Sequence, residues 1–352
     1  MKRKIRIDKI LLLTLMGSLF FVGCGKKEET ETDLAAETVE TEAVVEEKES
    51  IKAVKVGASL LVDSKEAKLC LDGFIKGMEE EGYIEPSTLT LVPDFAGGTS
   101  LMAGENTKNF VEKEIDLLFS LGSMATVSAH TALKGEDIPL VYAGVANPDE
   151  VGLSDFYGVP KDEFTIGISD KSMMEDELNL IKTIYPNLNK IAFIYTVGNQ
   201  NALKELNIVK GLAAARGITV VEGGIYQVKD VEEVALKLSK EADAFLMLSD
   251  ENTDLAIETI LSVSRQKNIP VFANSQPQVE AGALAGICKD YHSMGKKAGM
   301  LAAKILKGKT VIKEAKVEKM QNGYLCLNKS VAERLNIEFT EILLRKAKEV
   351  YE

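Results

Sequence analysis

The chain has 352 residues, of which 45% are hydrophobic and 27% are charged. This length suffices for two domains of ordinary size, and the apolar content excludes a chain that is disordered throughout. The formal net charge of −12 argues against a general nucleic-acid-binding protein, because binding to phosphates requires clustered lysine and arginine. Four scattered cysteines and two histidines leave little material for a disulfide framework, a metal site or histidine-based catalysis.

Residues 1–23 have the layout of a secretory signal peptide. Five basic side chains precede an apolar run over 10–22, which is shorter than the roughly 20 residues that a membrane-spanning helix needs. The run ends in the letters FVGC at 21–24, which resemble a bacterial lipobox. We therefore expect a lipoprotein whose Cys24 carries diacylglycerol and palmitate, anchored on the outer side of the bacterial cell membrane. The alternative is an uncleaved membrane anchor with an incidental cysteine.

Residues 24–53 are predicted to form an acidic, disordered tether. After the cysteine the segment is rich in Glu and Thr and holds no aromatic residue, so it cannot bury enough apolar surface to offset its chain entropy. Residues 1–23 carry five basic side chains and one acidic one, so their removal takes the net charge from −12 to about −16. A protein outside the cytoplasm has no supply of ATP or NAD(P)H, which argues against a kinase or a dehydrogenase.

From Val54 onward, short β-rich apolar runs alternate with longer amphipathic patterns, which is typical of parallel α/β units. A first array of strands is predicted at 54–61, 88–95, 116–122, 139–145 and 164–169. A second array has strands at 190–196, 219–226, 244–249, 270–275 and 283–288, with helices at 172–185, 200–216, 230–241 and 253–267. Two arrays of similar size predict two doubly wound lobes, each with a sheet covered on both faces.

Small polar residues follow several of these strands, among them Ser123, Asn147, Asp250 and Asn274. Each can cap the next helix, and helix starts present free N–H groups that suit a carboxylate. Ligands of doubly wound sheets bind beyond the carboxyl ends of the strands. Two lobes that face each other at those ends predict a cleft for a small molecule.

Five stretches of the chain occur in a combination that is specific to one family. They are GFIKGMEEEGYIE at 73–85, VANPDEVGL at 145–153, SDENTD at 249–254, the segment 269–309, and LCLNKSVAERLNI at 325–337. In this order they resemble the ABC-transporter substrate-binding lipoproteins related to the tryptophan-binding TrpX type, and the resemblance spans 54–352.

The resemblance implies a type I periplasmic-binding-protein fold, with two Rossmann-like lobes joined by three crossovers. Lobe 1 would comprise 54–168 and 288–310, and lobe 2 would comprise 169–287 and 311–352. It also implies a monomer without catalytic activity, cofactor or metal, which binds a small-molecule ligand and works with an ABC permease and its ATPase in import.

The resemblance further implies a cleft that captures an amino acid, possibly an aromatic one. A ligand carboxylate would lie at the loop 122–126, on backbone N–H groups and the hydroxyl of Ser123 or Thr126. Asp250 would hold the ligand ammonium. The full set of residues that the resemblance places at the ligand is Ser59, Leu60, Leu61, Gly122, Ser123, Met124, Ala125, Thr126, Ala146, Asn147, Pro148, Tyr195, Asn199, Asp250, Asn252, Asn274 and Asp290.

Two other functions compete with transport. An exported hydrolase would need a nucleophile and a base, but no Gly-x-Ser-x-Gly motif is present, and Ser128 and His130 are only neighbours on a predicted helix. A ligand-sensing lipoprotein that reports to a receptor or kinase would use the same fold and the same cleft closure.

Overall fold

The computed structural model describes residues 51–170, 173–320 and 323–352. The predicted signal peptide, the lipidated Cys24 and the acidic tether lie outside the described residues. Among the helices that the structure does describe, none has both the length and the apolar character needed to cross a membrane.

Lobe 1 is built on a six-stranded, all-parallel sheet with the strand order β11-β5-β4-β3-β1-β2. The strands are β1 (Val54–Leu60), β2 (Leu89–Phe95), β3 (Leu117–Leu121), β4 (Leu140–Ala143), β5 (Thr165–Asp170) and β11 (Glu318–Met320). The helices are α1 (Lys65–Glu80), α2 (Ser100–Glu112), α3 (Ser123–Ala132) and α10 (Tyr291–Leu306). Every residue of β3, β4 and β5 is buried, as expected for parallel strands that are covered on both faces.

Lobe 2 is built on a seven-stranded sheet with the order β13-β12-β10-β9-β8-β6-β7, in which β10 and β12 are antiparallel. The strands are β6 (Lys190–Thr196), β7 (Thr219–Ile225), β8 (Ala244–Leu246), β9 (Val271–Ser275), β10 (Ala285–Lys289), β12 (Tyr324–Asn328) and β13 (Glu349–Tyr351). The helices are α4 (Met174–Ile184), α5 (Gln200–Ala214), α6 (Val231–Leu238), α7 (Glu251–Leu255), α8 (Ile257–Lys267), α9 (Gln276–Ala281), α11 (Lys329–Arg334) and α12 (Glu341–Lys346).

The chain passes between the two sheets three times: after β5, after β10 and after β11.

Two expected boundaries differ from the structure. Residues 288–289 end a strand of the lobe 2 sheet, because Cys288 completes the core beneath that sheet. Residues 312–320 belong with lobe 1, since Ile312 enters the lobe 1 core and β11 pairs with β5. The helix expected over 253–267 is divided at Ala256 into α7 and α8.

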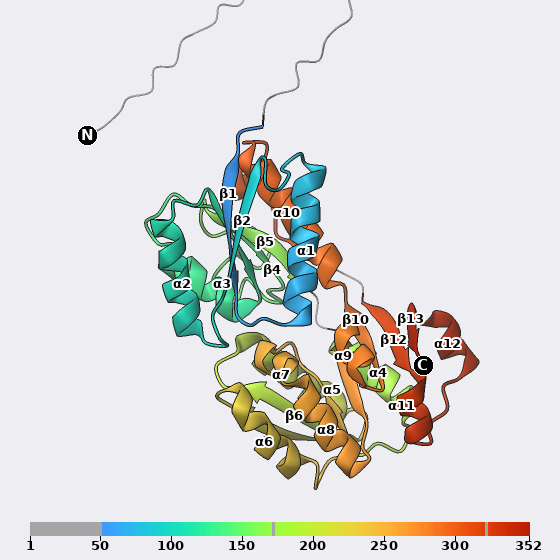
Figure 1. The fold of residues 1–352 in the computed structure, drawn as a ribbon. Coiled ribbons are helices and arrows are strands. Elements are labelled where there is room, and N and C mark those ends of the chain that lie inside the picture. The colour runs from blue at the N-terminus through green and yellow to red at the C-terminus, as the bar shows by residue number, and fades with distance from the viewer. Residues whose placement is uncertain (1–50, 171–172, 321–322) are drawn as a thin grey trace, which may run out of the picture. The chain divides into compact units, whose positions relative to one another are not determined.

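The helices α1 and α10 lie side by side on one face of the lobe 1 sheet, although some 200 residues separate them in the chain (Figure 1). Glycines on both helices allow this approach. A Cβ atom on Gly77 would overlap the carbonyl oxygen of Lys296, and one on Gly295 would overlap the carbonyl oxygen of Cys70. This packing holds α10 against lobe 1. Because α10 begins just after β10 ends, its first residues lie at the cleft.

Candidate functional site

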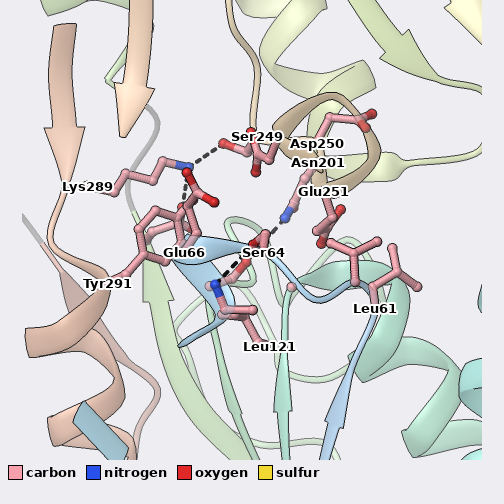
Figure 2. Close-up of a pocket in the computed structure, with 16 residues that line it drawn as sticks. Leu61, Ser64, Glu66, Leu121, Asn201, Ser249, Asp250, Glu251, Lys289 and Tyr291 are labelled. Atoms are coloured by element: carbon pink, nitrogen blue, oxygen red, sulfur yellow. Dashed lines mark hydrogen bonds and ion pairs between the residues drawn. The ribbon is translucent and has the colours of Figure 1, made fainter. Parts of the chain in front are cut away.

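A cavity of about 40 Å³ lies between the lobes, at the carboxyl ends of both sheets (Figure 2). We call it the inner cavity. Its walls from lobe 1 are Leu61, Val62, Ser64, Glu66, Ala67, Leu121, Gly122, Gly144, Asp170 and Tyr291, and those from lobe 2 are Asn201, Ser249, Asp250, Glu251, Asp254 and Lys289. Ligands of doubly wound sheets bind at this end, so the predicted location of the cleft matches the geometry.

Hydrogen bonds between the lobes hold the cleft closed. The Ser275 hydroxyl donates to Glu66 Oε1 at 2.7 Å, and Asn252 Nδ2 donates to the carbonyl of Gly98 at 3.3 Å. Asn201 Nδ2 donates to the carbonyl of Gly144 at 3.3 Å. Each of these bonds joins one residue of lobe 1 to one of lobe 2, so the structure represents the closed arrangement of the two lobes.

The start of α3 presents backbone N–H donors on the lobe 1 wall. Gly122 precedes the helix with φ of 81°, and no side chain caps the first turn. The Ser123 hydroxyl is 2% exposed and has no hydrogen-bond partner among the described residues. The Thr126 hydroxyl, in contrast, donates to the Gly122 carbonyl at 2.7 Å. Free N–H groups and a positive helix end make this a position suited to an anion.

Asp250 caps α7 and is saturated inside lobe 2. Its Oδ2 accepts from the backbone N–H of Thr196 at 2.6 Å, and its Oδ1 accepts from the Thr196 hydroxyl at 2.7 Å. The N–H groups of Asn252 and Thr253 also donate to Oδ1. Burial raises the pKa of Asp250, and these hydrogen bonds oppose the shift. Both oxygens of Asp250, which we expected to hold the ligand ammonium, thus already accept hydrogen bonds from the protein.

Three other carboxylates line the inner cavity. Glu66 Oε1 accepts from Ser275, Glu251 Oε2 accepts from Asn199 at 3.0 Å, and Asp254 Oδ1 accepts from Gln278 at 2.7 Å. We call Glu66, Glu251 and Asp254 the carboxylate triad.

Burial and neighbouring charges raise the pKa values of two members of this triad, Glu251 and Asp254. Burial, and next the adjacent Asp250, raise the pKa of Glu251 to about 7. Burial, followed by the charges of Glu66 and Glu251, raises the pKa of Asp254 well above its usual range. The protonated forms of Glu251 and Asp254 are therefore favoured in this environment.

Lys289, which lines the inner cavity, forms ion pairs with two buried carboxylates. Its ammonium lies 2.5 Å from Asp170 Oδ2 and 3.5 Å from Glu205 Oε1, and it also donates to the Ser249 hydroxyl (Figure 2). Burial alone would lower the pKa of Lys289, but Asp170 and Glu205 outweigh that effect and raise it. Since Asp170 belongs to lobe 1 and the other groups to lobe 2, this buried ion pair joins the lobes beside two of the crossovers.

A larger pocket of about 460 Å³ adjoins the inner cavity at Asn201, and we call it the outer pocket. It is lined by Ser100, Ser123, Met124, Val127, Ser128, Asn147, Glu150, Val151, Val197, Gly198, Gln200 and Asn201. Its apolar side chains come from both lobes, and its volume lies in the range of pockets that hold small organic ligands.

The structure separates the predicted ligand residues into two groups. Those that line the inner cavity or the outer pocket are Leu61, Gly122, Ser123, Met124, Asn147 and Asp250. Those that line neither are Ser59, Leu60, Ala125, Thr126, Ala146, Pro148, Tyr195, Asn199, Asn252, Asn274 and Asp290. Within the second group, Asn199 holds Glu251, Asn252 bridges the lobes, and Asp290 caps α10.

Several cavity residues were not singled out from the sequence. The most important are Glu66, Asp170, Glu251, Asp254 and Lys289. Lys289 did carry a signal, because a lysine stands at the end of the apolar run ALAGIC, where a buried strand has no use for a charge. Glu251 lies inside the SDENTD stretch, where helix capping was the simpler interpretation.

Ser128 and His130 do not form a nucleophile and base pair in the described structure. His130 Nδ1 lies 3.0 Å from the Thr165 hydroxyl and 3.5 Å from Asp162 Oδ2, at the amino end of the sheet. Ser128 lines the outer pocket. The two side chains therefore have different surroundings, although both belong to α3.

Two α/β lobes, three crossovers and an interlobe cavity at the carboxyl ends define a type I periplasmic-binding-protein fold. Comparison with known proteins agrees. Residues 55–351 match the family model described as ABC transporter substrate binding protein, and the chain belongs to that family.

Individual relatives cover most of the chain. A tyrosine-binding protein of Clostridioides difficile is 28% identical over 312 residues, which are 87% of this chain and 86% of that protein. A domain from Streptococcus pneumonia solved in complex with L-Trp has a TM-score of 0.80 at 23% identity, covering 85% of this chain and 100% of that one. The ligand-free, open structure of a substrate-binding protein with adhesive properties from Clostridium difficile has a TM-score of 0.61 at 24% identity, covering 85% and 99%.

Proposed function

We propose that this protein captures an amino acid, of the aromatic class, and delivers it to an ABC importer. The observation that carries the proposal is the opposite polarity of the two sides of the cleft. An uncapped helix start faces it from lobe 1, and Glu251 faces it from lobe 2. A buried zwitterion needs a partner for each charge, because an unpaired buried charge costs several kcal/mol.

The two partners lie next to each other only in the closed arrangement. A Cβ atom on Gly122 would overlap Glu251 Oε1, so this carboxylate sits directly against the chain that leads into α3. The ammonium and carboxylate of an α-amino acid are attached to one carbon atom, and they require such neighbouring sites of opposite sign. Ligand binding then favours closure, which is the change that a permease or a sensor can detect.

The outer pocket suits the ligand side chain. The inner cavity is too small for an aromatic ring, whereas the outer pocket has about 460 Å³ and begins at Ser123 and Met124, beside the proposed carboxylate position. Val127, Val151 and Val197 provide apolar walls from both lobes. The names of the tyrosine-binding relative and of the tryptophan complex support the same ligand class.

The remaining parts of the proposal concern location and partners. The signal-like start and Cys24 support a lipid-anchored, extracytoplasmic monomer that works with a permease and an ATPase. Within this scheme the long acidic segment after the cysteine would let the binding lobes reach the permease.

The first test is a thermal-shift screen. The protein is unfolded and refolded to remove carried-over ligand, and then mixed with amino acids, sugars, nucleosides and short peptides. A ligand at about a hundred times its dissociation constant adds roughly 2.7 kcal/mol, which produces a clear shift in Tm. Selective stabilisation by Tyr, Trp or Phe supports the proposal, and stabilisation by sugars or nucleosides alone overturns its ligand class.

Ser123→Ala tests the carboxylate position. We expect about 10-fold or greater loss of affinity, because a hydrogen bond to a charged group is removed. The Tm of the ligand-free variant should not fall, since the Ser123 hydroxyl has no hydrogen-bond partner among the described residues. Thr131→Ala, an exposed change on the same helix, is the control for binding by calorimetry. Unchanged affinity in Ser123→Ala would place the carboxylate elsewhere.

A further inference from the structure

The strand ends at which the chain crosses between the lobes lie next to one another. In lobe 1, Asp170 ends β5 and is paired with Met320, which ends β11. In lobe 2, Cys288, which precedes the last residue of β10, is paired with Tyr324, which begins β12. We call the strand ends at 170, 289, 320 and 324 the hinge. All three crossovers therefore start or finish at this one side of the cleft.

A buried ion pair spans the hinge. Lys289 Nζ lies 2.5 Å from Asp170 Oδ2, and the two residues are 5% and 6% exposed. Lobe 2 holds the lysine through Glu205 Oε1 at 3.5 Å, and Glu205 accepts from the hydroxyl and the N–H of Ser249 at 2.5 and 2.6 Å. Lobe 1 holds Asp170 in the parallel ladder between β5 and β11. Each partner is thus fixed by its own lobe.

Apolar packing reinforces the same place. A Cβ atom on Gly323 would overlap the Met173 sulfur and Ile287 Cγ2, so the glycine lies directly against both side chains. Met173 follows the first crossover, Gly323 follows the third, and Ile287 belongs to β10, which leads into the second. Chain segments from all three passages are therefore in contact beside the ion pair.

The contact at the far edge of the cleft is of a different kind. Asn252 Nδ2 donates to the Gly98 carbonyl at 3.3 Å, and neither group is charged. Gly98 follows β2, and β2 lies four strand positions from β5 in the lobe 1 sheet, about 19 Å at about 4.8 Å per strand. When two bodies rotate, a contact is displaced in proportion to its distance from the axis. The edge contact therefore separates early, whereas groups at the hinge hardly move.

The energies of the two contacts lead to the same conclusion. When an amide–carbonyl hydrogen bond opens, water replaces the lost partner, and the net cost is small. When a buried ion pair is broken, each lobe is left with a desolvated charge, and the cost is far greater. Thermal opening of the cleft can break the first contact but not the second.

We propose that the ion pair between Lys289 and Asp170 is the pivot of the hinge. The pair persists in the open and the closed forms, and the lobes turn about it, while the contact between Asn252 and Gly98 is made only on closure. Lys289 is thus a positioning residue, which determines how the two walls of the cleft meet. The inference goes beyond the proposed function, because it does not depend on which ligand is bound.

The test needs a form of the protein that cannot close fully, and Gly98→Asn provides it. A Cβ atom on Gly98 would overlap Asn252 Oδ1, while asparagine tolerates the φ of 85° at this position better than other side chains do. Gly97→Asn is the matched control, since Gly97 has a φ of 61° and no atom within 4 Å of its Cβ position. Small-angle scattering should give a larger radius of gyration for ligand-free Gly98→Asn than for the parent and Gly97→Asn. Equal radii would show that the edge contact does not govern closure, which overturns the proposal.

A double-mutant cycle then tests the pivot in both forms. Asp170→Asn, Lys289→Gln and the double variant are made in the parent and in Gly98→Asn, and urea unfolding is measured without ligand. We expect a coupling of about 10-fold or more in the unfolding equilibrium constant, equal in the two backgrounds within about 2-fold. Coupling in the parent that disappears in Gly98→Asn would show that the pair forms only on closure, and absent coupling in both would show that there is no pivot.

A second measurement needs no change of charge. The ammonium of a buried, ion-paired lysine exchanges its protons slowly, so Lys289 should give a ¹⁵Nζ signal in NMR spectra that is assigned by its loss in Lys289→Arg. The signal should persist in ligand-free Gly98→Asn. Its loss there would contradict the pivot even if Lys289→Gln failed to fold.

The outcomes separate the pivot from the proposed function. For an amino acid that binds, the same cycle on the dissociation constant should give a coupling of about 2-fold or less, because the pair is present before and after closure. A coupling of about 10-fold or more would overturn the pivot and leave the amino-acid function standing. If no amino acid binds, the amino-acid function is wrong, and the urea cycle still decides the pivot.

Discussion

At the residue scale, Asp250 illustrates how capping and ligand binding compete for one side chain. A carboxylate at a strand end can hold an ammonium or can satisfy the free N–H groups of the next helix. Here it does the second, and it also fixes Thr196 at the end of β6. Because Asp250 caps α7, the adjacent Glu251 is not needed as a cap, and its side chain lines the inner cavity.

Asp250→Ala should therefore destabilise the protein, not merely weaken ligand binding. The change removes the α7 cap and leaves the buried N–H of Thr196 without an acceptor, which together cost about 2–4 kcal/mol. Urea unfolding of the ligand-free variant measures this loss, with the exposed Glu241→Ala as control. An unfolding midpoint equal to that of the parent would show that Asp250 is dispensable for the fold.

Only part of the candidate site could be predicted from single residues. Gly122, Ser123 and Asp250 follow strands, and the rule that ligands gather at carboxyl ends was enough to find them. Glu66 and Asp254 carry no such local signal, because each lies inside the first turns of a helix where an acidic residue is ordinary. Their importance arises from closure of the lobes, which joins positions almost 190 residues apart.

At the element scale, the glycines of α1 and α10 determine how closely two distant segments approach. Gly77→Ala should destabilise the protein by about 3 kcal/mol or more, because its Cβ would overlap the backbone of Lys296, and backbone cannot move aside as a side chain can. Gly104→Ala is the matched control. It lies within α2 with no atom near its Cβ position, so the same change should stabilise by about 0.5–1 kcal/mol.

Thermal or urea unfolding of the two variants measures these opposite shifts. If Gly77→Ala were as stable as Gly104→Ala, the close contact between α1 and α10 would be wrong.

The predicted elements agree best where sequence patterns are local. The strand at 190–196 matches β6 residue for residue, and the strand at 88–95 matches β2 within one position. The elements after 310 were not predicted, because β11 and β13 have three residues each and carry no periodicity of their own. They form strands because a sheet edge is available beside β5 and β12.

At the scale of the whole molecule, closure of the cleft in the ligand-free protein should depend on pH. In the closed structure burial is the main cause that raises the pKa of Glu251 to about 7 and that of Asp254 well above the usual range, and we expect opening of the cleft to reduce this burial. Closure therefore takes up protons. The closed form is favoured below the ordinary carboxyl pKa, and this advantage is lost as the pH rises through about 7.

Small-angle scattering of the ligand-free protein between pH 5 and 8.5 measures this change as an increase in the radius of gyration. Saturating amino acid should remove the dependence, because an ammonium replaces the protons. Glu251→Gln should remain closed to higher pH, since it cannot ionise. A radius that is constant with pH in the ligand-free parent would contradict the proposed linkage.

The three crossovers also govern when each lobe can fold. The first lobe lacks α10 until residue 306 has been made and lacks β11 until residue 320, although its other strands are complete by residue 170. Many of its stabilising contacts thus join segments far apart in the chain, and such contacts form slowly. A nascent chain would therefore remain without a finished lobe 1 core for most of its synthesis.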